Sequence, residues 1–134
     1  MKQSSFRYLG AFDLVIVAAF LAAFGVGALG STPIALMVLA GVTALLAGSL
    51  AELSLGPITI SWRGFAAATY LLFAALLPAT YLPHVVAGTA TTSETALFAV
   101  SCVSAAVFVF MGFDIARGGK HFEVRANVER VVGR

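Results

Sequence analysis

No polar side chain interrupts the stretch Leu14-Val-Ile-Val-Ala-Ala-Phe-Leu-Ala-Ala-Phe24. The apolar segment around it covers about residues 10–30, and roughly 20 apolar residues in a helix are enough to cross a bilayer. Similar segments cover about residues 33–52, 65–82 and 95–116. The chain is 60% hydrophobic and 10% charged, whereas about 25% of the residues in a soluble domain are charged. The sequence therefore predicts an all-α integral membrane protein, a four-transmembrane-helix bundle.

The basic residues predict how this bundle is oriented. Two of them precede the first span, one lies between the second and third spans, and the rest follow the fourth: Lys2 and Arg7, Arg63, and Arg117, Lys120, Arg125, Arg130 and Arg134. The two loops on the other side contain neither Lys nor Arg. Because short basic loops stay on the cytoplasmic side, we expect a multi-pass protein of the cell membrane with both termini in the cytoplasm.

The first apolar segment also has some features of a cleaved signal peptide. Lys2 and Arg7 precede it, and Ala28-Leu29-Gly30 loosely resembles a cleavage site. The segment is longer than the usual apolar region of a signal peptide, and its removal would place the two termini on opposite sides. We therefore favour an uncleaved span, a membrane domain over residues 1–119, and a cytoplasmic amphipathic tail over residues 120–134.

Two cytoplasmic segments have the alternating pattern of a strand. Ile58, Ile60 and Trp62 alternate with polar residues after a helix-breaking Gly56-Pro57 pair. In the tail, residues 122–128 alternate in the same way, although the valines of the tail also fit a helical stripe. We expect residues 58–62 and 122–128 to pair as a short cytoplasmic β-ribbon. The alternatives are an irregular interfacial loop for the first segment and a helix for the tail.

The boundaries of the later spans carry their own signals. Pro78 should kink or end the third helix, Ser93-Glu94 should begin the fourth, and Gly118-Gly119 should end it. At the cytoplasmic edge, Trp62, Arg63 and Arg117 have the character of interface anchors, because aromatic and basic side chains favour the headgroup level.

Two carboxylates are the first candidates for a functional site. Apart from Glu52 at the very end of the second span, Asp13 and Asp114 are the acidic residues inside the predicted spans, each about three residues, or about 5 Å, from the cytoplasmic edge. One interpretation is a paired site that takes up a cation or a proton. The other, which we favour, is ion pairing at the membrane edge, where Asp114 could reach Arg117 and neither acid would have to lose its water.

Tyr70 is the candidate for a polar contact in the core. It lies near the middle of the third span, where its hydroxyl needs a hydrogen-bond partner. Small residues provide a second packing signal, because they let helices approach closely in lipid: Ala40, Ala44 and Gly48, Ser101 and Ala105, and Gly25, Gly27 and Gly30.

Several function classes are disfavoured. His84 and His121 fall on opposite sides of the predicted membrane, and no Cys/His cluster accompanies Cys102, so we expect no metal and no cofactor. No nucleophile has a base nearby, so we expect no enzyme activity. The net charge of +2 is explained by orientation and by anionic lipid, so we expect no nucleic-acid partner.

The remaining pattern favours a protein that acts by association. We expect an accessory or scaffold subunit that works through helix packing and its tail, with membrane lipids and a protein partner or further copies of itself as neighbours. The alternative is an oligomeric transporter or channel for a small solute or an ion, although polar residues at mid-membrane, which such a path needs, are missing.

Overall fold

The computed structural model describes residues 1–133; Arg134, one of the basic residues used for orientation, lies outside the described residues. The fold is mostly helical, with a small three-stranded sheet. Four helices are long and apolar enough to cross a membrane: α1 (Ser5–Phe24), α2 (Thr32–Ser49), α3 (Trp62–Ala79) and α5 (Thr92–Ala116). They correspond to the four predicted segments.

The first helix differs most from its predicted bounds. It begins at Ser5, five residues earlier than the apolar segment, and it ends at Phe24, where Gly25 has a φ of 81°. Residues after this glycine form a separate 3-10 helix, η1 (Val26–Gly30). Positive φ costs glycine little, so Gly25 ends the helix in a way that other residues would resist. The early start places Asp13 well inside the helix.

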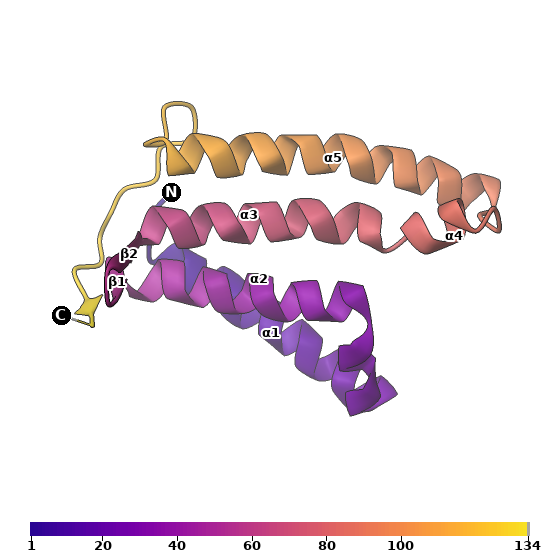
Figure 1. The fold of residues 1–134 in the computed structure, drawn as a ribbon, viewed down its shortest axis with the longest axis horizontal. Helices are drawn as coiled ribbons and strands as arrows, with labels where there is room; N and C mark the ends of the chain where they lie inside the picture. Colours follow the sequence, from indigo (N-terminus) through magenta and orange to yellow (C-terminus); the bar gives the residue numbers. More distant parts are fainter. Residues whose placement is uncertain (134) are drawn as a thin grey trace.

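The four long helices alternate in direction, and each packs mainly on its neighbour in the chain. Their order in space is α1, α2, α3, α5 (Figure 1). α1 and α5 do not pack along their lengths, so the predicted bundle is an open row. Both termini and the strands lie at one end, which we call the sheet end (Figure 1). The α1–α2 hairpin diverges from α3 and α5 towards the other end, which we call the far end.

The tightest core lies at the sheet end. Phe6, at the start of α1, is fully buried and packs with Trp62 and Phe65 of α3 and with Ile115 of α5. This cluster joins the start of α1 to the ends of α3 and α5, and α1 separates from those two helices further along. Every Lys and Arg residue that the structure describes also belongs to this end, as the orientation argument requires.

The sheet is built around a hairpin between α2 and α3. β1 (Glu52–Leu55) pairs antiparallel with β2 (Ile58–Ser61), and β3 (Val131–Val132) pairs parallel with β1 on its other side. The connection between β1 and β2 is Gly56-Pro57, and Gly56 has a φ of 62°. A positive φ followed by the fixed negative φ of proline suits a two-residue hairpin turn. The pair that breaks the helix thus also reverses the strand.

The predicted strand at residues 58–62 is confirmed over Ile58–Ser61, whereas Trp62 begins α3, and the predicted partner of the strand is wrong. Residues 122–128 form neither a strand nor a helix; only Arg125 makes an isolated bridge, to Lys2. The partner of β2 is β1, which is two residues away in the chain. A short loop loses little entropy when it closes, so the local hairpin outcompetes a pairing with the distant tail.

The other boundary signals act near their predicted places. α3 ends one residue after Pro78, and Gly118 and Gly119 follow α5 with positive φ. α5 begins slightly earlier than predicted because Thr91, rather than Ser93, is its N-cap and forms a capping box with Glu94. A short helix, α4 (Leu82–Val86), precedes it at the far end, where His84 Nδ1 lies 2.8 Å from Glu94 Oε1.

Candidate functional site at the sheet end

Glycine allows α1 and α2 to meet backbone to backbone. A Cβ atom on Gly10 would lie 2.5 Å from the carbonyl oxygen of Gly41 and 2.7 Å from the backbone nitrogen of Leu45. Gly48 is pressed against the backbone of Arg7 in the same way. Gly48 was among the predicted packing residues, whereas Gly27 and Gly30, also predicted, have open space around them. The close approach therefore lies in the half of the hairpin nearest the sheet end.

Asp13 is enclosed by this close approach. The residue is 4% exposed, and the carboxylate oxygen Oδ2 has no hydrogen-bond partner among residues 1–133. A Cβ atom on Gly41 would lie 3.1 Å from Oδ2, so the glycine leaves the space into which the carboxyl group projects. The expectation that Asp13 keeps its water is wrong. It lies eight residues beyond Ser5, about 12 Å along the helix, and points towards α2.

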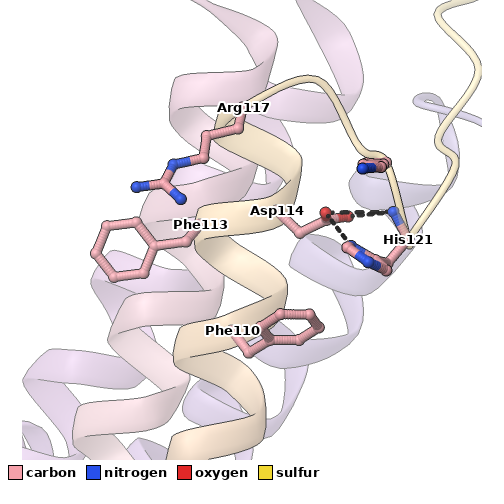
Figure 2. Close-up of a pocket in the computed structure, with 6 residues that line it drawn as sticks. Phe110, Phe113, Asp114, Arg117 and His121 are labelled. Atoms are coloured by element: carbon pink, nitrogen blue, oxygen red, sulfur yellow. Dashed lines mark hydrogen bonds and ion pairs between the residues drawn. The ribbon is translucent and has the colours of Figure 1, made fainter.

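Asp114 has a different environment (Figure 2). Its carboxylate accepts hydrogen bonds from the backbone N–H of His121 at 3.0 Å and of Phe122 at 2.8 Å, and Nδ1 of the His121 ring lies 2.9 Å from Oδ1. The predicted partner, Arg117, instead places its guanidinium 5.9 Å from the centroid of the Phe113 ring. Asp114 thus holds the turn that follows α5, and its oxygens are satisfied.

The structure does not bring the two carboxylates together. Asp13 faces α2 and Asp114 faces the turn after α5, and these parts of the chain are separated by α3 (Figure 1). A paired carboxylate site of the first interpretation is therefore not formed by this chain. The two acids differ sharply in polar satisfaction, and Asp13 is the one whose chemistry is unexplained.

Tyr70 contributes aromatic packing. Its ring lies 6.1 Å from Phe6 in an edge-to-face arrangement and 6.0 Å from Phe108, and no hydrogen bond of its hydroxyl is found within residues 1–133. The polar contact between neighbouring spans comes from the adjacent residue: the hydroxyl oxygens of Thr69 and Thr43 are 3.0 Å apart. The sequence signal was a threonine at comparable depth in each of two neighbouring spans.

The three predicted interface anchors have different environments. Trp62 is 7% exposed and belongs to the core, so its ring does not lie on the outer surface. The Arg63 guanidinium lies 5.1 Å from that ring, and Nη1 donates to the carbonyl of Ile115 at 3.5 Å. Arg117 is exposed beside a pocket of about 260 Å³ (Figure 2). The lining residues of this pocket are Phe110, Phe113, Asp114, Arg117, Lys120 and His121.

The tail segment from His121 to Val132, which we call the strap, crosses the helix ends in a way that the sequence pattern did not predict. From the turn at His121 it runs past the N-terminus to β1 (Figure 1). The N–H of Arg125 donates to the Met1 carbonyl at 3.0 Å, and the N–H of Gln3 donates to the Arg125 carbonyl at 2.9 Å. Further along, the N–H of Ala51 donates to the Arg130 carbonyl at 2.7 Å. The strap thereby links the end of α5 to the start of α1 by backbone hydrogen bonds, in addition to the core contact between Phe6 and Ile115.

Within residues 1–133, the structure assembles neither a metal site nor a nucleophile with a neighbouring base. No group of three His, Cys, Asp or Glu side chains within residues 1–133 is placed to hold a metal ion. The hydroxyls of Ser101 and Ser104 donate to carbonyls of their own helix, at 2.7 Å and 3.0 Å. Cys102 is exposed on α5.

Residues 1–128 match the family of unknown function DUF7994, so the chain belongs to this family. No curated protein and no solved structure matches the chain.

Proposed function

We propose that this protein is an accessory or scaffold subunit of the cell membrane, with both termini in the cytoplasm, that acts by packing against another membrane helix. The orientation rests on the basic residues gathered at the sheet end, since short basic segments stay on the cytoplasmic side. The proposal for function rests chiefly on α5.

The observation that carries the proposal is an exposed face of α5. In its most apolar window only 11% of residues are buried, against 39% in α3, because α5 packs along one side only. Five exposed residues follow one another at alternating intervals of three and four along this helix: Ala96, Ala99, Val103, Ala106 and Phe110. We call this set the α5 seam.

The spacing and composition of the α5 seam are those of a helix-packing surface. Alternating steps of three and four keep side chains on one face that can interlock with a second helix. Small residues allow close backbone approach, which drives helix association where lipid supplies no hydrophobic force. The strap, which begins beside Phe110 at the sheet end, adds a cytoplasmic surface for the same partner.

The decisive experiment measures the complex extracted gently from its native membrane. We expect a second protein in fixed stoichiometry with this chain. The double variant Ala99→Leu/Ala106→Leu should lose at least tenfold of that protein, because two larger side chains would hold the partner helix away. The matched control is Ala19→Leu/Ala22→Leu, at exposed positions of α1. A complex unchanged by the α5 variant would contradict the proposal.

A second candidate is an oligomeric transporter or channel for an ion or small solute. It is favoured by Asp13, because an ionisable residue buried inside a span is a functional candidate in lipid. Here native extraction should yield a homo-oligomer without a second protein. Reconstituted vesicles should then show a flux that Asp13→Asn abolishes and Asp114→Asn retains.

A further inference from the structure

We propose that Asp13 is a proton-binding site within the α1–α2 interface, where its side chain is held as a neutral carboxylic acid. The proposal concerns this residue alone, and it holds for either function above. It assigns the proton to the carboxyl group that the close approach of the two helices encloses.

The carboxyl group of Asp13 is enclosed by the two helices. Asp13 is 4% exposed, and Oδ2 has no partner within residues 1–133. An ionised carboxylate only accepts hydrogen bonds, and burying one without donors costs far more than burying the neutral acid. The backbone contacts at Gly10 and Gly41 leave little room for water to supply those donors.

In the part of the chain that the structure describes, the surroundings of Asp13 also lack a positive charge that could stabilise a carboxylate. α2 has no charged or titratable residue between Thr32 and Ser49, and η1 has none. On α1 itself the other charged residue is Arg7, about 9 Å away along the axis, whose guanidinium lies 5.6 Å from the exposed Tyr8 ring. Arg63 of α3 is occupied by Trp62 and Ile115. No described cation therefore faces Asp13.

Occupancy by a metal ion fits poorly. A bound cation needs several oxygen or nitrogen ligands, and no cluster of three ligating side chains exists within residues 1–133. Most carbonyl groups around Asp13 are engaged within the two helices. A proton needs only the carboxyl group itself. It converts one carboxyl oxygen from an acceptor into an O–H group that can donate a hydrogen bond to a neighbouring carbonyl.

The protonation state of Asp13 depends on how closely α1 and α2 pack. With the proton bound, α1 and α2 meet as neutral surfaces in lipid. If water entered the interface, the proton would be released to it and the resulting carboxylate would resist reclosure. The Asp13 proton should therefore be held while the hairpin is closed and exchanged only when it opens.

The chain offers an unusually clean test, because Asp13 and Asp114 are its two aspartates. Protein labelled with ¹³C at the aspartate carboxyl groups should give two carboxyl signals by NMR or infrared spectroscopy in vesicles at neutral pH. We expect one signal of a protonated acid and one of a carboxylate. The variant Asp114→Asn should remove the carboxylate signal and leave the protonated one.

Two further results complete the test. Asp13→Asn should remove the protonated signal; if that variant fails to fold, Asp114→Asn still assigns the remaining signal to Asp13. Gly41→Ala, which crowds Leu14 and Asp13, should open the interface and increase exchange of the acid proton with D₂O. Two carboxylate signals in the wild-type protein, or an Asp13 signal that shifts with added Na⁺ at constant pH, would overturn the proposal.

Discussion

Single glycines set the distance between α1 and α2, and Gly10 lies at one of the closest approaches of the two backbones. An added Cβ atom would meet two backbone atoms of α2, at 2.5 Å and 2.7 Å, and backbone cannot rotate away as a side chain can. We expect Gly10→Ala to destabilise the protein by about 1–3 kcal/mol, the usual cost of overpacking. Unfolding in detergent by a denaturant measures this loss.

The control for that prediction is Gly27→Ala. Nothing lies within 4 Å of a Cβ atom at Gly27, and its φ is not in the positive range. This variant should keep the wild-type stability or exceed it slightly. Equal losses in both variants would mean that glycine flexibility, rather than close helix approach, is what the hairpin needs.

Asp114 shows a second kind of residue effect, because its carboxylate satisfies backbone groups that α5 leaves behind. Asp114→Ala would free the amide groups of His121 and Phe122. We expect faster hydrogen exchange at both amides and a loss of about 1–3 kcal/mol. Glu123→Ala is the control, since within residues 1–133 the Glu123 side chain makes only an exposed contact of 3.6 Å with Arg125. Unchanged exchange at His121 and Phe122 would refute this role.

The apolar segments that form the long helices could be predicted, but the depth of individual residues within them could not. The segment before Gly10 contains Arg7 and Tyr8, so an apolar pattern excludes it from the first span. Backbone hydrogen bonding continues through these residues, because a helix does not end where its side chains become polar. This shift of five residues, with the rotation of Asp13 towards α2, separates an edge carboxylate from a buried one.

At the scale of elements, α2 and α3 are joined by a hydrogen bond between Thr43 and Thr69. Polar contacts between membrane helices average about 0.6 kcal/mol in double-mutant cycles. We expect a coupling of that size from Thr43→Val, Thr69→Val and the double variant, measured by unfolding. Thr80→Val should not couple to Thr43→Val, because the Thr80 hydroxyl bonds to the Leu76 carbonyl and, within residues 1–133, makes no hydrogen bond with Thr43.

The long helices and β2 could be predicted because their signals are local: apolar runs, an alternating segment, Gly56-Pro57 and Pro78. The pairing of β1 with β3 could not. Glu52, where β1 begins, reads as the end of the second span, and Val131–Val132 is too short to carry a period. Which strands meet depends on where the strap crosses the helix ends, and that is a property of the whole fold.

At the scale of the whole molecule, the strap compensates for the open row of helices. α1 and α5 do not pack along their lengths, yet both are bound to the segment from His121 to Val132. Its contacts with the N-terminus include the Ser4 backbone N–H, which donates to Asn127 Oδ1 at 2.9 Å. The strap should therefore fix the separation of the two outer helices at the sheet end.

Ending the chain at Lys120 tests this directly. Spin labels at Phe12→Cys and Ala116→Cys, two exposed positions, would report the separation of α1 and α5 in a Cys102→Ser background. We expect a narrow distance distribution in the full chain and a broader one in the shortened chain, because the strap's hydrogen bonds are lost while the helix pairs remain. Labels across α3 and α5, which pack directly, should keep their distribution. If the α1–α5 distribution also stays narrow, the core around Phe6 is sufficient to hold the row, and the strap is free to serve a partner.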